Sequence, residues 1–255
     1  SKEITSEYIV KIFNQIQLIL NEENVDTDVE ISQIHRESKL KYDKCLRHFE
    51  VFNTFNVIPK NCFDCYKIQI LPRNVIELIK LYVVFDNLNL KINLTRKCMI
   101  EFRENIKEPY KGFIYCVGIE EAKKTLKLLN PILDKSINKE VPRLIKRGCS
   151  EFAMSYPEYK ETNSKDKDFM TYNEDWLVKE NIIDEKLSRN PKEHVIEDTS
   201  LQGIGIKDAI ILYNWLYYAK KIGDQSYKII CEKPNYSKYI DGKLTDKIIQ
   251  GLELN

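Results

Sequence analysis

The chain begins with apolar residues that recur every three or four positions. From residue 3 to residue 22 they fall mainly on one side of a helical projection, which predicts an amphipathic helix. A second helical pattern covers 31–52, and the polar stretch after it, with Pro59 and three asparagines, predicts a loop. Residues 1–60 are therefore expected to form a helical N-terminal segment.

From Cys65 onward, strand-like and helix-like repeats follow each other in a regular order. Alternation predicts strands at 66–71, 97–103, 112–117 and 145–154, and helical spacing predicts helices at 74–88 and 119–134. The resulting β-α-β-β-α-β order over residues 61–156 predicts an α+β, ferredoxin-like core. Such a core is an antiparallel sheet with strand order 4-1-3-2 and helices on one face.

Residues 157–255 carry two further helical patterns after a polar stretch. The patterns cover 174–187 and 205–224, and the second ends at Gly223 with two lysines in its last turn, where cations suit the helix dipole. We expect this C-terminal helical segment to pack on the core.

Composition narrows the class of protein. The 255 residues are 43% hydrophobic and 31% charged, with 40 basic against 39 acidic side chains, which is typical of a globular protein. No apolar run is long enough for a membrane span, and the N-terminal pattern is not that of a secretory signal. We expect a cytoplasmic protein without a membrane partner, in which seven cysteines are mostly reduced.

Several of the cysteines fall in or beside the predicted strands, and a Cys-x-x-Cys pair opens the first strand. If Phe113 and Tyr115 point to the core, alternation places Cys65, Cys116 and Cys149 on the opposite face, with Cys62 at its edge, and Cys98 is the replacement ligand if the alternation of its strand is the reverse. Thiolates are soft ligands that favour zinc and iron–sulfur clusters. The sequence thus predicts a zinc or iron–sulfur centre, with buried structural cysteines as the alternative.

Charged residues are predicted on the same face as the cysteines. They are Lys67, Glu101, Arg103, Arg147 and Glu151. Opposed charges on rigid strands can preorganise a site for an anionic substrate. We therefore expect a cleft in which these residues act on a small polar or anionic substrate, in an enzyme of unspecified reaction class. The alternative is that they pair with one another on a solvated sheet face.

The segment with His35 and Glu37, followed by Cys62 and Cys65, resembles the H-x-E…P-C-x-x-C signature of zinc-dependent cytidine and adenosine deaminases. Pro59 here lies three residues before the first cysteine instead of next to it. The resemblance implies that His35, Cys62 and Cys65 hold zinc and that Glu37 is the general acid and base. A nucleobase or nucleoside deaminase is therefore an alternative function.

The stretch "YKGFIYCVG" resembles the RNP1 motif of the RNA-recognition motif family, which lies on the third strand of a β-α-β-β-α-β sheet. The matching residues are Lys111, Gly112, Phe113 and Tyr115, whereas Ile114 stands where the family has a small residue. The resemblance implies that Phe113 and Tyr115 stack bases and that Cys116 points into the core. The chain has no basic excess, so we favour a small-molecule substrate and keep RNA binding as a further alternative.

Overall fold

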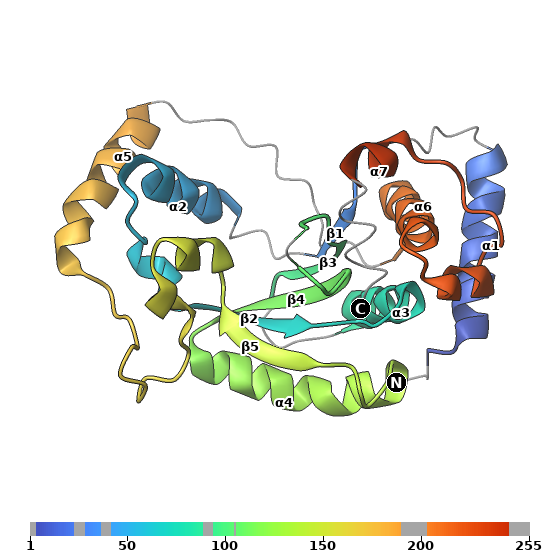
Figure 1. The fold of residues 1–255 in the computed structure, drawn as a ribbon, viewed down its shortest axis with the longest axis horizontal. Coiled ribbons are helices and arrows are strands. Elements are labelled where there is room, and N and C mark those ends of the chain that lie inside the picture. The colour runs from blue at the N-terminus through green and yellow to red at the C-terminus, as the bar shows by residue number, and fades with distance from the viewer. Residues whose placement is uncertain are drawn as a thin grey trace.

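The computed structural model describes residues 4–22, 29–36, 42–88, 94–104, 106–189 and 203–244. It is a mixed α+β structure in which helices surround a central antiparallel sheet (Figure 1). The strands are β1 (Gln33–Arg36), β2 (Cys65–Ile70), β3 (Arg96–Ile100), β4 (Tyr110–Val117) and β5 (Arg143–Arg147). Their order across the sheet is β1-β3-β4-β2-β5, and each neighbouring pair is antiparallel.

Helices follow most of the strands along the chain. The α-helices of the described residues are α1 (Ser6–Glu22), α2 (Tyr42–Phe55), α3 (Val75–Asn87), α4 (Ile119–Ser136), α5 (Leu177–Arg189), α6 (Ile206–Lys221) and α7 (Lys238–Lys243). Short 3-10 helices are η1 (Lys60–Cys62), η2 (Ser150–Met154), η3 (Pro157–Lys160), η4 (Glu174–Trp176) and η5 (Gln225–Ile229). None of the described helices is long and apolar enough to cross a membrane.

Helices α3 and α4 lie on the same side of the sheet (Figure 1). Asn74 caps the start of α3, because its side chain accepts a hydrogen bond of 2.9 Å from the backbone N–H of Glu77. Helix α3 approaches β4 closely at Gly112, where a Cβ atom would lie 2.3 Å from the side chain of Leu81. The position of Gly112 therefore identifies the face of the sheet that α3 covers.

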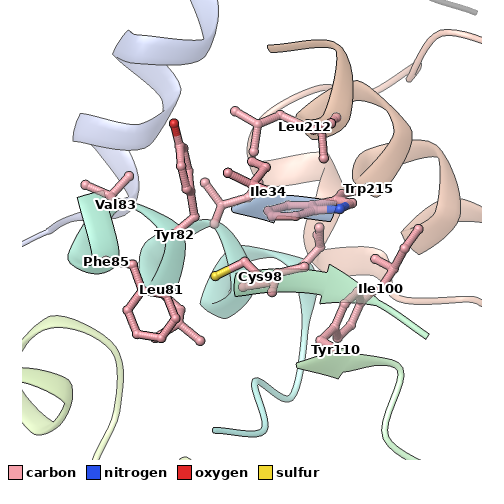
Figure 2. Packing of buried hydrophobic residues seen from close by; sticks show 14 of the residues in the cluster. Ile34, Leu81, Tyr82, Val83, Phe85, Cys98, Ile100, Tyr110, Leu212 and Trp215 are labelled. Atoms are coloured by element: carbon pink, nitrogen blue, oxygen red, sulfur yellow. The ribbon is translucent and has the colours of Figure 1, made fainter. Parts of the chain in front are cut away.

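The main core lies on this helix-covered face and extends to α6. Ile34 of β1 is directly opposite Cys98 of β3, and both lie beside Trp215 of α6 and Tyr82 of α3 (Figure 2). The indole N–H of Trp215 donates a hydrogen bond of 2.8 Å to the carbonyl of Ser32, so this buried polar atom is satisfied. Helix α6 thus completes the core of the sheet.

A second, smaller cluster of apolar side chains lies between α2 and the 3-10 helices. Its fully buried members are Ile58, Cys62, Phe152 and Tyr159. Helix α5 joins α2 through Arg47, whose guanidinium forms ion pairs of 2.5 and 2.7 Å with Glu180 and Asp184. The two helices α5 and α6 therefore pack on different parts of the molecule.

Two predicted secondary-structure elements are wrong. The helix predicted at 31–52 is a short strand, β1, followed by α2, because Ile34 pairs with the edge of β3 and joins its core. The strand predicted at 145–154 ends at Arg147. After it, Gly148 lies so close to Cys65 that a Cβ atom would be 2.3 Å from its Sγ, and the chain turns into η2. Cys149 and Glu151 therefore lie outside the sheet.

Candidate functional site

The face of the sheet away from α3 and α4 carries polar and aromatic side chains. Residues directly opposite each other in antiparallel strands point to the same side, and Gly112 points to α3, so its neighbour Phe113 points away from it. The register then defines what we call the second face of the sheet: His35, Lys67, Gln69, Lys97, Lys111, Phe113, Tyr115 and Lys146.

The predicted orientation of β4 is wrong. Phe113 and Tyr115 were expected in the core with Cys116 on the polar side, but Cys116 is directly opposite Tyr66 and buried in the main core. Strand β4 is apolar at nearly every position, so alternation alone could not fix its orientation. The orientation that the RNP1 resemblance implied for Phe113, Tyr115 and Cys116 matches the register.

Two lysines lie on either side of Phe113 on this face. The ammonium of Lys67 is 5.1 Å from the centre of the Phe113 ring and 3.5 Å from Oγ of Ser150, and the side chain is only 6% exposed. Lys97 of β3 is directly opposite Phe113 and is partly exposed. Within the described residues, neither ammonium forms an ion pair with a carboxylate. The carboxylates of Glu151 and, for Lys97, Glu101 act on these ammonium groups from beyond ion-pair distance, so the positive charge of this part of the second face is only partly compensated.

The surroundings lower the pKa of both lysines. Burial is the main cause for Lys67, and the negative charge of Glu151 opposes it. Burial and the positive charge of Lys67 lower the pKa of Lys97 to about 8, although Glu151 and Glu101 raise it. His35, opposite Lys97 on β1, has its pKa lowered to about 4 by burial and by Lys97 and Lys207, so it is neutral at pH 7.

Glu101, just after β3, has its own cationic partners. Lys111 and Arg103 donate hydrogen bonds of 2.6 and 2.7 Å to Oε2 of Glu101, and the side chains of Lys111 and Glu101 are almost fully buried. Burial raises the pKa of Glu101, but the hydrogen bonds from Arg103 and Lys111 outweigh it and lower the pKa to about 2. Glu101 is therefore ionised and is compensated locally.

Arg147 lies apart from the other predicted charged residues. It is directly opposite Tyr66, on the helix-covered side, and donates hydrogen bonds to the carbonyls of Phe63 and Glu161. Its guanidinium lies 4.9–5.8 Å from the centres of four rings, those of Phe63, Tyr66, Tyr159 and Phe169. Because of these contacts, we interpret Arg147 as a residue that stabilises the fold. The predicted placement of Arg147 with Lys67 is wrong.

Three of the four predicted cysteine ligands, Cys62, Cys65 and Cys149, are near enough to act on each other electrostatically, but Cys116 points to the opposite side of the sheet from Cys65. Cys116 lies in the main core, whereas Cys62 and Cys149 pack in the smaller aromatic cluster and Cys65 lies against Gly148. Burial raises the pKa of the Cys62 thiol and raises that of Cys149 to about 12. Among the described residues, no group of three or more His, Cys, Asp or Glu side chains is arranged to hold a metal ion. The zinc or iron–sulfur centre stays a prediction without support from this geometry.

The arrangement implied by the deaminase resemblance is not formed either. His35 is on β1 and Cys65 is on β2, three strand positions apart, which corresponds to about 14 Å. Zinc–ligand bonds of about 2.0–2.3 Å cannot join groups so far apart. Glu37, the implied acid and base, lies outside the described residues.

Lys97 was not among the site residues predicted from the sequence, and only the RNP1 resemblance linked Phe113 and Tyr115 to this face. The signal for Lys97 is its register opposite Phe113, which appears only when the strands are paired. In comparisons with known proteins, no family model, curated protein or solved structure matches the chain.

Proposed function

We propose that the second face of the sheet binds a small phosphate-bearing ligand. The observation that carries this proposal is the position of Lys67 and Lys97 on either side of the Phe113 ring, without an ion pair to a described carboxylate. The positive charge of Lys67 disfavours the protonated form of Lys97, and that of Lys146 disfavours the protonated form of Lys67, so an anion bound beside them would be stabilised. Lys146, directly opposite Lys67 on β5 and exposed, adds a third positive charge at the edge.

Aromatic side chains support a ligand that has a planar ring. The rings of Phe113 and Tyr115 are neighbours on β4, with centres 6.3 Å apart. Phe113 is only 7% exposed, whereas Tyr115 is partly exposed, so the ring of Tyr115 is the one that a ligand can reach. A base that stacks on Tyr115 would place its phosphate near Lys97. A mononucleotide satisfies both requirements.

We also propose that β2 to β5 with α3 and α4 form a ferredoxin-like unit, to which β1 is added at one edge. Without β1, the strand order is β5-β2-β4-β3, which corresponds to the 4-1-3-2 order of that fold. In such a unit the helices occupy one face of the sheet. The opposite face is then available for a ligand.

Single-stranded RNA is a second candidate ligand, because Phe113 and Tyr115 have the orientation of base-stacking RNP1 residues. The low exposure of Phe113 and Lys67 argues against it, since an RNA platform needs aromatic rings that several bases can reach. The small ligand is therefore our principal proposal.

Titrations of the isotope-labelled protein with pyrophosphate, adenosine monophosphate and a hexauridylate test this proposal by NMR. We expect the two small anions to shift the backbone signals of β3 and β4 near Lys97 and Tyr115, and the hexanucleotide to bind no more tightly than the mononucleotide. Tighter binding of the hexanucleotide would favour RNA. Shifts confined to α4, on the opposite face, would contradict both candidates.

A further inference from the structure

Lys97 differs from the other lysines of the second face in its access to solvent and its surroundings. It lies within β3, directly opposite His35 on one side and Phe113 on the other, so its backbone position is fixed by pairing on both sides. Unlike Lys67 and Lys111, it is partly exposed. Of these three lysines, Lys97 is therefore the one that solvent and a small reactant can reach in part.

The groups around Lys97 favour its neutral form. Burial is the main cause that lowers the pKa of Lys97, the positive charges of Lys67 and Arg103 add to it, and the negative charges of Glu151 and Glu101 oppose it. With a pKa of about 8, about one tenth of the amine is neutral at pH 7, against well below one hundredth for an ordinary lysine. A lysine that is desolvated or lies next to another cation is a known type of activated nucleophile.

We infer that Lys97 is a nucleophilic amine that forms an imine with small aldehydes or ketones that also carry an anionic group. This inference rests on the proposed function, because the cationic face that would bind a phosphate would also attract the anionic group of the carbonyl compound. Lys67, on the other side of Phe113, is a positioning residue that supplies this charge.

Imine formation by Lys97 requires neither an oxidant nor a reductant. The lone pair of the neutral Lys97 amine attacks the carbonyl carbon, and a C–N bond forms to give a carbinolamine. The carbonyl oxygen then leaves as water with two protons, one of them from the nitrogen, and a C=N bond remains. The imine gains a proton and is then electrophilic, which is the state that Schiff-base lysines use in catalysis.

Glyoxylate trapping tests the inference. The full chain is incubated at pH 7 with glyoxylate, an aldehyde that carries a carboxylate, and with cyanoborohydride, whose hydride fixes the imine; peptide mass mapping then locates the adduct. We expect Lys97 to be labelled at least about tenfold faster than Lys127, an exposed lysine of α4, because of its larger neutral fraction. The labelling rate of Lys97 should rise to half its maximum near pH 8.

Variants and a second probe separate the two proposals. Lys67→Met should slow labelling by glyoxylate more than labelling by uncharged acetaldehyde, and Lys127→Met should change neither rate at Lys97. Labelling of Lys97 no faster than Lys127, in a protein that binds pyrophosphate, would overturn the inference and leave the proposed function standing. Fast labelling of Lys97 by both probes alike, without protection by pyrophosphate, would overturn the proposed function and support only the reactive amine.

Discussion

The ammonium nitrogen of Lys67 lies 5.1 Å from the centre of the Phe113 ring, and both side chains are more than nine-tenths buried. A cation held over an aromatic ring gains a favourable interaction of about 0.5–2 kcal/mol, which offsets only part of the cost of burying its charge. The ring carries no net charge. The positive potential on this face of the sheet therefore remains available to an anionic ligand.

The ion pair between Lys111 and Glu101 should contribute strongly to stability. Glu101→Gln would leave the buried ammonium of Lys111 without its carboxylate, so we expect a loss of about 3–5 kcal/mol in the free energy of unfolding. Urea denaturation at pH 7 measures this loss in the free energy of unfolding. Glu120→Gln, which breaks an exposed ion pair with Lys123 on α4, is the control and should change nothing measurable. Equal effects of the two substitutions would contradict the buried position of Glu101.

His35 should make the protein less stable in mild acid. Its pKa is about 4 in the folded state against an ordinary value of about 6.5, so between these values the unfolded chain binds more protons. Stability should thus fall as the pH decreases from about 6.5 to about 4. His35→Gln should flatten this part of the profile of unfolding free energy against pH. An unchanged slope in the variant would show that other groups cause the acid sensitivity.

Gly112 should be intolerant of a side chain. In Gly112→Ala the added Cβ would lie 2.3 Å from a side-chain carbon of Leu81, so this side chain must leave its position or α3 must move away from β4, at a cost of about 1–3 kcal/mol. Thermal unfolding measures the loss. Gly242→Ala in α7, where a Cβ meets nothing within 4 Å, is the matched control and should be neutral or slightly stabilising. A stable Gly112→Ala variant would refute the close approach of α3 to the sheet.

Arg147 should affect stability and leave ligand binding unchanged. Arg147→Lys keeps the charge but loses the planar group that lies among four rings and donates to backbone carbonyls. We expect a destabilisation of about 1–3 kcal/mol by urea denaturation, with the affinity for pyrophosphate unchanged. A selective loss of affinity would instead support the role that the sequence suggested.

Much of the sheet could be predicted because β2 and β3 have apolar core residues at alternate positions, although the polar Lys67 and Gln69 of β2 are buried as well. Tyr66, Ile68 and Ile70 of β2 are buried in the main core as expected, and so are Cys98 and Ile100 of β3. Strand β1 was missed because it has four residues and a single buried side chain, Ile34, which is too short for a periodic pattern.

The site was less predictable because it depends on which strands are neighbours. Lys67 and Lys97 are thirty residues apart, and only the pairing of β2 and β3 with β4 brings them to the same ring. The cysteines could not be placed correctly from the sequence for a related reason. The exact end of β5 decides where Cys149 points, and the apolar pattern of β4 leaves the side of Cys116 undetermined.

Calorimetric titration with pyrophosphate at low salt measures directly whether the second face of the sheet binds an anion. We expect binding to the wild-type protein, a loss of at least about tenfold in affinity for Lys97→Met, a further loss when Lys67→Met is combined with it, and no change for Lys127→Met. An affinity that is the same in the double variant and in Lys127→Met would contradict anion binding at the second face of the sheet.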